Sequence, residues 1–321
     1  FLPGGKRLSY GDFLTRAGRF AAVLRAAELE PGDRLAVQLE KSPDALAVYA
    51  ACVMTGVIFL PLNTAYAPAE VSYFLSDSGA KLMICDPAKE AALWPVAEAA
   101  DAQLATLGSE GEGTFAEQAQ NRTPELSATS RKTDDLAAFL YTSGTTGRSK
   151  GAMLTHDNLL SNAQVLKEEW GFTQQDVLLH ALPIFHTHGL FVATNITLLA
   201  GGACMFLPKF DAEQMIALMT RCTAMMGVPT FYTRLLDCEE FDRDLVAHMR
   251  LFVSGSAPML KDTHDQFQWR TGHKVLERYG MTETNMSTSN PLDGDRRTGT
   301  VGLPLPGVEL KICDPETGEE V

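Results

Sequence analysis

Two apolar patterns alternate along the chain: short, continuous apolar runs and longer runs with helical spacing. Residues 34–39 are typical of a buried strand, and residues 43–55 predict a helix whose first turn Ser42 is placed to cap. Further strands are predicted at residues 81–85, 136–142, 177–182, 203–207, 223–228 and 251–254. Further helices are predicted at residues 155–170, 190–199, 212–220, 230–236 and 258–271, the last beginning with Pro258. This repeated order indicates an α/β fold of largely parallel sheets with helices packed on them.

Three stretches need a separate interpretation. Residues 45–62 carry no charge over a length near the minimum for a membrane span, but Gly56 and Pro61 favour a buried helix followed by a buried strand. Residues 101–131 are polar and lack apolar periodicity, so we predict a loop and connector there. Residues 308–312 are strand-like and precede a predicted turn.

Composition limits the class of partner. The chain of 321 residues has a net charge of −13, which argues against nucleic acid or an anionic membrane as the main partner. Its six cysteines are widely spaced, which favours a reducing cytoplasm over a disulfide framework or a zinc site. The first residues lack both a signal-peptide layout and a Met, so we expect the chain to be a fragment at its front.

The most distinctive motif is YTSGTTGRSKG at residues 141–151, directly after a predicted buried strand. Glycines let backbone N–H groups approach a polyphosphate, hydroxyl groups donate to phosphate oxygens, and cations offset the charge. The motif is not a Walker A loop, because that pattern requires Gly-Lys where this chain has Ser149 and Lys150. A flexible surface linker is the alternative interpretation.

Four further motifs follow in the sequence. They are ALPIFHTHG at 181–189, SGSAP at 254–258, RYGMTET at 278–284 and GTVGLP at 299–304. Ligands of α/β folds bind beside the carboxyl ends of strands, so we expect the loops after Tyr141, Leu182, Val253 and Tyr279 to converge on one crevice. Together with YTSGTTGRSKG, these motifs resemble, in order, the signatures of the adenylate-forming superfamily, which includes acyl-CoA synthetases, luciferases and peptide-synthetase adenylation domains.

The resemblance implies a domain organisation. Residues 1–307 would form the large N-terminal adenylation domain, with two α/β subdomains, and residues 308–321 would begin a small β subdomain. A ribose-binding aspartate, a hinge and a lid domain with a catalytic lysine normally follow in this family and are not in this chain. We therefore expect this piece to bind nucleotide but to catalyse poorly by itself.

The resemblance also implies a reaction. A carboxylate attacks the α-phosphate of ATP to give an acyl-adenylate and pyrophosphate, and the thiol of CoA then displaces AMP. Such a reaction depends on positioning and on neutralising charge, with Mg²⁺ bound beside the phosphates. The cofactors and substrates implied are ATP, Mg²⁺, CoA and a carboxylic acid.

The resemblance assigns nucleotide roles to individual positions. The phosphate loop contributes Thr142, Ser143, Gly144, Thr145, Thr146, Gly147 and Lys150. Positions near adenine and the α-phosphate are Gly255, Ser256, Ala257, Arg278, Tyr279, Gly280, Met281 and Thr282. Glu283 and Thr145 are the candidate Mg²⁺ ligands. For Glu283 the alternative is an exposed glutamate at a strand end, and for Tyr279 it is a core aromatic residue.

The acid is harder to identify. His186 would line or gate the acyl tunnel and act with Thr282 and Glu283, and Ser254 would lie beside the acyl group. PIFHTHG contains no acidic residue that could hold an amino group. Arg234 and Arg296 are each close to pocket-forming segments and could grip a second carboxylate bidentately.

The combined motifs resemble those of malonyl-CoA synthetases, which take malonate and often methylmalonate. Thr187 and Met286 would then bound the space around C2 of the substrate. Three alternatives stay open: a short- or medium-chain or aryl acid–CoA ligase, a non-catalytic nucleotide-binding module, and a P-loop kinase or ATPase. For both arginines, a surface cation is the alternative.

Overall fold

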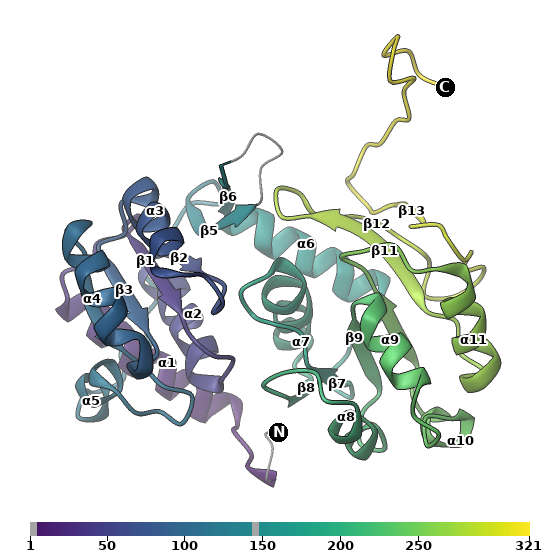
Figure 1. Ribbon diagram of the computed structural model, residues 1–321, viewed down its shortest axis with the longest axis horizontal. Coiled ribbons are helices and arrows are strands. Elements are labelled where there is room, and N and C mark those ends of the chain that lie inside the picture. The colour runs from purple at the N-terminus through teal and green to yellow at the C-terminus, as the bar shows by residue number, and fades with distance from the viewer. Residues whose placement is uncertain (1–4, 143–147) are drawn as a thin grey trace. The chain divides into compact units, whose positions relative to one another are not determined.

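The computed structural model describes residues 5–142 and 148–321 (Figure 1). Its contacts divide the chain into two compact units. Unit 1 comprises Phe1–Ser161, Ala181–Asn195 and Met205–Phe210. Unit 2 comprises Asn162–His180, Ile196–Cys204 and Asp211–Val321.

Unit 1 is built on a six-stranded sheet with the order β4-β3-β1-β2-β5-β6. Its strands are β1 (Arg34–Gln38), β2 (Ile58–Pro61), β3 (Leu82–Cys85), β4 (Gln103–Thr106), β5 (Leu136–Thr142) and β6 (Lys150–Thr155). All the neighbouring pairs are parallel except β5 and β6, which form an antiparallel hairpin. The five parallel strands form the mainly parallel sheet that the pattern predicted.

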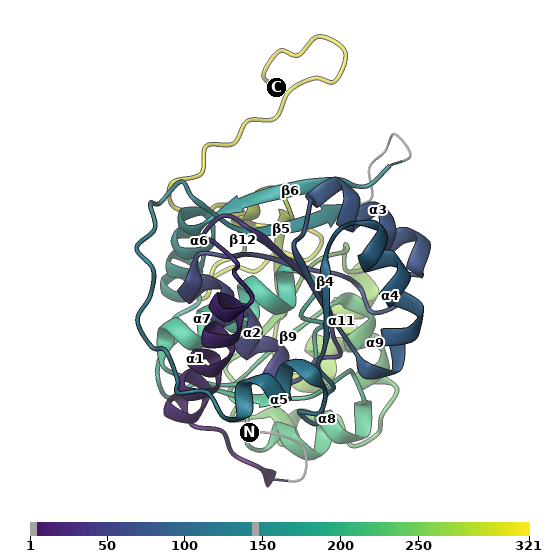
Figure 2. The same ribbon diagram turned by 90° about the vertical axis from the view of Figure 1, so that its left-hand side faces the viewer.

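Helices cover both faces of this sheet. They are α1 (Tyr10–Ala26), α2 (Pro43–Thr55), α3 (Pro68–Ser78), α4 (Glu90–Ala99) and α5 (Thr114–Gln120), with a 3₁₀ turn η2 (Pro87–Lys89). Because β2 and β3 flank β1 on opposite sides, right-handed crossovers place α2 and α3 on opposite faces. Figure 2 shows α1 and α2 on one side of the strands and α3 and α4 on the other.

The predicted caps of α2 are present. The Ser42 hydroxyl accepts a hydrogen bond from the Ala45 amide at 3.1 Å, and Gly56 ends the helix with φ of 76°. Most side chains of α2 and all those of β2 are buried, which explains the uncharged stretch at residues 45–62. Across the described ranges, no helix has the length and apolar character needed to cross a bilayer.

Unit 2 is built on a seven-stranded sheet with the order β13-β12-β11-β10-β9-β7-β8. Its strands are β7 (Val177–His180), β8 (Ala203–Phe206), β9 (Ala224–Gly227), β10 (Leu251–Ser254), β11 (Leu276–Met281), β12 (Asn285–Ser289) and β13 (Leu303–Pro304). β7, β9, β10 and β11 are parallel, whereas β12 is antiparallel to both its neighbours. Its helices include α8 (Ala212–Met219), α9 (Pro229–Leu236), α10 (Arg243–Val246) and α11 (Lys261–Thr271), and α6 (His156–Glu169) and α7 (Asn195–Ala200) contribute most of their residues.

The structure differs from the sequence pattern in several places: helices α1, α3 and α4 and strand β6 were not predicted, and the helix expected at 190–199 is the π-helix His188–Thr194 followed by α7. Residues 101–131 contain β4 and α5, because Phe115 and Ala119 of α5 provide a short buried stripe that the surrounding polar residues obscure. Helix α11 begins at Lys261, so Pro258 lies outside it. Residues 308–312 form no strand in the described structure; Leu310 and Ile312 are exposed and have no strand beside them with which to pair.

An ion pair with a buried carboxylate links the start of β7 to the start of β10 within unit 2. The Arg250 guanidinium donates to both carboxylate oxygens of Asp176, at 2.6 and 2.9 Å, and to the Trp170 carbonyl at 2.9 Å. Thr223 donates to the same carboxylate at 2.7 Å. Burial by itself would raise the pKa of Asp176, but the hydrogen bonds from Arg250, Thr173 and Thr223 outweigh it and hold the pKa below its usual range.

Asp176→Asn should lower the free energy of unfolding by about 2–3 kcal/mol, because it leaves a partly buried guanidinium without its counter-charge. Since the folded pKa is depressed, the carboxylate stabilises the fold above the unfolded value of about 3.9 and loses that contribution as pH falls through the folded pKa. Urea unfolding followed by tryptophan fluorescence checks both points. The matched control is Asp265→Asn in the exposed Lys261–Asp265 pair, which should change the free energy of unfolding far less, because water screens that pair. Equal losses would contradict the assignment.

Candidate functional site

The described parts of the phosphate motif are the two ends of a β-hairpin. Thr142, the last residue of β5, pairs with Lys150, the first residue of β6, and its hydroxyl donates to the Lys150 carbonyl at 3.4 Å. The Lys150 and Arg148 side chains are exposed. Ser143, Gly144, Thr145, Thr146 and Gly147 lie outside the described residues, so their phosphate and metal roles remain predictions. Both cations follow that segment in the sequence, on the side that leads into β6.

The ALPIFHTHG motif leads into an unusual helix in unit 1. Residues His188–Thr194 form a π-helix, η3, a widened turn that is rare in proteins and frequent at functional sites. A Cβ on Gly189 would lie 2.0 Å from the Pro183 carbonyl oxygen, so this close approach requires glycine. The chain therefore turns sharply at this point and presents His186 and Thr187 at the start of the helix.

His186 and Thr187 differ in environment. The Thr187 side chain is buried, and its hydroxyl has no hydrogen-bond partner among the described residues. His186 is exposed to solvent in part. The protein around it still desolvates the imidazole, which lowers the pKa of His186, so the ring is neutral at pH 7. A buried hydroxyl without a partner carries a free-energy cost that a ligand could remove.

In unit 2, the SGSAP turn leaves the end of β10 directly beside β11. The strand register pairs Ser254 with Glu277, so Gly255 comes next to Arg278. A Cβ on Gly255 would lie 2.3 Å from the carbon atom of the Arg278 guanidinium. Ser256 adopts φ of 68°, and Ser256 and Ala257 are exposed. The absence of a side chain at Gly255 thus creates the space that the guanidinium occupies.

Arg278 is a buried cation, and two of its nitrogen atoms lack hydrogen-bond partners in the described structure. Its side chain is 4% exposed, and neither Nε nor Nη2 has a hydrogen-bond partner in the described structure. Burial lowers the pKa of Arg278 to about 10, so it remains protonated at pH 7. The buried hydroxyl of Ser254 also has no partner. Buried polar groups are normally satisfied, which makes this pair a candidate for binding an anion.

The YGMTE motif forms the end of β11 and the turn that follows. Tyr279, Gly280 and Met281 lie within the strand, and Tyr279 and Met281 are exposed. Gly280 packs so closely that a Cβ would lie 2.1 Å from the Asn285 carbonyl oxygen. After this strand come the half-buried Thr282 and the exposed Glu283, and Met286 is buried on β12. The exposed Tyr279 ring does not match the alternative of a core aromatic residue.

The two arginines predicted to hold a second carboxylate differ in their surroundings. The Arg296 guanidinium donates to the carbonyls of Lys274, Pro291 and Leu292. These contacts engage all three of its nitrogens and stabilise the loop between the YGMTE and GTVGLP motifs. Arg234 is exposed on α9. No sequence pattern identified Arg278 as the buried arginine, because its burial depends on the packing of β11 beside β10.

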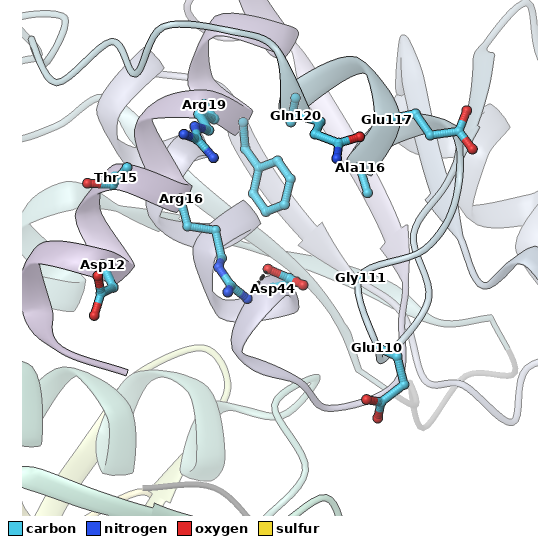
Figure 3. Close-up of a pocket in the computed structure, with 12 residues that line it drawn as sticks. Asp12, Thr15, Arg16, Arg19, Asp44, Glu110, Gly111, Ala116, Glu117 and Gln120 are labelled. Carbon is cyan, nitrogen blue, oxygen red and sulfur yellow. Dashed lines mark hydrogen bonds and ion pairs between the residues drawn. The ribbon is translucent and has the colours of Figure 1, made fainter. Parts of the chain in front are cut away.

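A hollow of about 590 Å³ in unit 1 lies apart from all these motifs (Figure 3). It is lined by residues of α1 and α5, by Asp44 and by the loop at residues 110–111. Arg16 reaches across it to the Asp44 carboxylate at 2.6 Å. Its lining mixes arginines with acidic side chains, so it favours neither an anion nor a cation, and it contains no predicted site residue.

Metal-binding groups are sparse in the described structure. No three His, Cys, Asp or Glu side chains of residues 5–142 and 148–321 are grouped so that they could hold a metal ion. A single carboxylate can still contribute to a metal site whose other ligands are waters and phosphate oxygens. Mg²⁺ commonly binds in this way, through one or two carboxylates and the phosphate oxygens of a nucleotide.

Comparison with known proteins agrees with the motifs. Residues 1–321 match the family model described as AMP-binding enzyme. Malonate–CoA ligase of Arabidopsis thaliana is 34% identical over 351 residues, which cover 97% of this chain and 57% of that protein. Malonate–CoA ligase ACSF3, mitochondrial, of Mus musculus is 36% identical over 283 residues, which cover 83% of this chain and 48% of that protein.

The solved structures agree as well. ATP-bound MatB from Rhodopseudomonas palustris has a TM-score of 0.97 and 54% identity, covering all of this chain and 64% of that one. This likeness confirms the predicted resemblance and fold class. The chain spans about half the length of the curated relatives it matches.

Gly189→Ala should destabilise the protein by about 2 kcal/mol, because the new methyl group meets a backbone carbonyl that cannot rotate away. Thermal unfolding measures the loss. Gly11→Ala is the matched control: Gly11 lies in α1, its nearest atom to an added Cβ is 3.7 Å away, and the change should stabilise the helix by about 0.5–1 kcal/mol. A neutral Gly189→Ala variant would show that the close approach is not required.

Proposed function

The chain belongs to the AMP-binding enzyme family, and we propose from this that it is the nucleotide- and acid-binding part of an ATP-dependent malonate–CoA ligase. Methylmalonate is the proposed second substrate. The observation that supports the proposal is the buried Arg278 guanidinium, whose Nε and Nη2 have no hydrogen-bond partner in the described structure. The likeness to two malonate–CoA ligases and to MatB supports the same substrate class.

The planar guanidinium of Arg278 suits a carboxylate better than a point charge such as an ammonium group would. Nε and Nη2 lie on the same edge of the guanidinium plane, and a carboxylate accepts from both in the bidentate arrangement. Malonate has two carboxylates, one to react and one to be held. We therefore assign Arg278 to the unreactive carboxylate, in preference to the nucleotide role that the resemblance implied and to Arg234 and Arg296. Each nitrogen of Arg296 already donates to a backbone carbonyl.

The proposed chemistry proceeds in two steps. An oxygen of the free carboxylate forms a bond to the α-phosphorus of ATP, and the bond from that phosphorus to the pyrophosphate oxygen breaks. The sulfur of CoA then attacks the acyl carbon, and AMP leaves as the thioester forms. Both steps join or separate anions, so orientation and neutralised charge lower the barrier most.

Other residues take roles that their positions support. Thr142 and Lys150, with the segment between them, would hold the β- and γ-phosphates, and the exposed Tyr279 ring would stack on adenine. Gly255, Ser256, Ala257, Gly280 and Met281 would surround the base and ribose. Thr282 would donate to the α-phosphate. Mg²⁺ would bind between Glu283 and the phosphate oxygens and would supply positive charge there.

The acid side would be formed by the start of η3. The neutral His186 would gate the entry of the acid, and Ser254 would donate to a carboxylate oxygen. Thr187, with its buried hydroxyl, and Met286 would limit the volume around C2 of the substrate. The cytoplasm is the proposed location of the protein; the mouse relative carries the word mitochondrial in its own name.

With malonate, ATP and CoA, the full-length protein should release AMP and pyrophosphate, and not ADP. Pyrophosphate exchange across a panel of malonate, methylmalonate, butyrate and benzoate should be fastest with malonate, because only a dicarboxylate satisfies the buried cation. Preference for butyrate or benzoate would favour a monocarboxylic acid–CoA ligase. Binding of ATP without exchange for any acid would favour a non-catalytic nucleotide-binding module, and ADP as product would favour a kinase or ATPase.

Arg278→Met should raise the malonate KM at least 30-fold, equivalent to about 2 kcal/mol, while the ATP KM stays within about twofold. Methionine replaces the guanidinium with an unbranched apolar chain, so no unpaired charge is left behind. Arg234→Leu is the matched control and should leave both constants near their wild-type values. If Arg278→Met weakens ATP instead, Arg278 binds the nucleotide; if Arg234→Leu weakens malonate alone, the second carboxylate lies on α9.

A further inference from the structure

We propose that Asn162, on helix α6, is a positioning residue that controls the choice of acid through Met286. Its side-chain amide holds the backbone of Met286 on β12, and the Met286 side chain in turn limits the space around C2 of the substrate. The inference rests on the proposed function in taking malonate as the substrate and Met286 as a boundary of its C2. Both residues lie in unit 2, and Asn162 lies in none of the sequence motifs.

The Asn162 side chain pairs with both backbone groups of Met286. Asn162 Nδ2 donates to the Met286 carbonyl at 2.8 Å, and the Met286 N–H donates to Asn162 Oδ1 at 3.3 Å. An asparagine amide carries a donor and an acceptor side by side, as a residue of a neighbouring strand does. In the described register, β13 pairs with Thr288 and Ser289, so its pairing stops short of Met286. Asn162 therefore takes the place of a strand residue beside Met286.

The strand around Met286 is irregular on both sides. Before it, Asn285 has φ of 53°, in the left-handed region that asparagine tolerates better than most residues. After it, Ser287 is the extra residue of a β-bulge, where the register between β11 and β12 shifts. Because a bulge disrupts the ladder locally, regular pairing holds Met286 less firmly than a residue of a continuous strand. The two hydrogen bonds from Asn162 supply the constraint that the ladder lacks there.

The Met286 side chain lies against the YGMTE motif. A Cβ on Gly280 would lie 2.6 Å from the Met286 Cε and 2.8 Å from its Cα. Met286 is 3% exposed, so its methyl group is enclosed by protein. Methionine is unbranched and flexible, and it fills space in whichever way its backbone position allows. A shift of the Met286 backbone therefore moves its methyl group and changes the volume open to a substituent on C2.

Helix α6 is anchored firmly enough to act as the support. Its buried side chains in unit 2 continue into the residue after the helix, and they are Ala163, Leu166 and Trp170. The Trp170 indole N–H donates to the Ser289 hydroxyl at 2.9 Å. From Asn162 to Trp170 the helix rises about 12 Å, and from Met286 to Ser289 the strand rises about 10 Å. The helix thus follows the strand and holds it at two points, of which only the first contacts Met286.

Asn162→Ala in the full-length protein should reduce the discrimination between malonate and methylmalonate. With its backbone released, Met286 can move aside. The ratio of kcat/KM for malonate to that for methylmalonate should therefore fall about fivefold, since one methyl group in an apolar pocket controls differences of this size or larger. The KM for ATP should stay within about twofold, because only the acid side changes. Pyrophosphate exchange with each acid gives these constants.

Asn162→Asp provides a second variant of the same shape. It keeps the acceptor for the Met286 N–H but loses the donor to the Met286 carbonyl, so it should lower the same ratio. This variant tests the inference even if Asn162→Ala fails to fold.

A double-mutant cycle tests whether Asn162 acts through Met286. Met286→Ala removes the side chain that limits the space, so it should lower the ratio by itself. Adding Asn162→Ala should lower the ratio no further, because the amide then has no side chain to position. Fold-changes that multiply would show that Asn162 acts independently of Met286, contrary to the inference.

The matched control is Ser289→Ala, which removes the other hydrogen bond between the same helix and the same strand. It should lower the Tm, because it leaves the buried Trp170 indole N–H without its acceptor, but it should keep the wild-type ratio of the two acids. An equal change of the ratio in Ser289→Ala and Asn162→Ala would reduce Asn162 to a general stabilising role.

Failure of the inference and failure of its premise give different results. An unchanged ratio in the Asn162 variants, with a lowered ratio in Met286→Ala, would overturn the role of Asn162 alone. An unchanged ratio in Met286→Ala would contradict the proposed place of Met286 beside C2. A wild-type protein that supports exchange with neither malonate nor methylmalonate would contradict the proposed function itself.

Discussion

Parallel strands in this chain require helices on both faces of each sheet, and that requirement decides where polar chemistry can occur. In unit 1, α1 and α2 cover one face of the sheet and α3 and α4 the other, so the strands are almost wholly apolar. Polar motifs are then confined to the segments that leave the strand ends. YTSGTTGRSKG follows β5, ALPIFHTHG follows β7, SGSAP follows β10 and YGMTE closes β11.

Glycines make these strand ends unusual, because three of them remove side chains where the backbone or a buried group approaches closely. Gly189 accommodates a carbonyl, Gly280 accommodates another, and Gly255 accommodates the Arg278 guanidinium. The last case has the greatest energetic consequence. A cation taken out of water without a counter-charge is costly, and an anionic ligand would remove that cost. The local geometry therefore favours a ligand that has a second carboxylate besides the one that reacts. This is the physical basis for proposing a dicarboxylic acid.

Unit 2 contains three arginines that illustrate two uses of the same group. Each nitrogen of the half-buried Arg250 guanidinium donates to Asp176 or to the Trp170 carbonyl, and the side chain joins secondary-structure elements. Arg278 is more deeply buried, at 4% exposed, and its Nε and Nη2 have no hydrogen-bond partner in the described structure. Arg296 resembles Arg250, since each of its nitrogens donates to a backbone carbonyl. The hydrogen-bond partners of an arginine thus decide whether it stabilises the fold or is available to bind a ligand. The sequence does not distinguish these cases, because all three residues are simply arginines.

The sequence by itself determined the α/β class, most strand and helix positions, the caps of α2 and the family, because these depend on local periodicity and on contiguous motifs. Strand β5 and helix α2 begin and end where the pattern placed them. It did not predict α1, α3, α4 or β6, it missed α5, whose buried stripe is only Phe115 and Ala119, and it expected a strand at residues 308–312, which form none in the described structure. Only the tertiary structure decided that Arg278 is buried with Nε and Nη2 unpartnered among the described residues, and that the side chains of Tyr73 and Asp77 on α3 form hydrogen bonds to the β5–β6 hairpin. Those properties arise from contacts between residues far apart in the chain, and no local pattern records them.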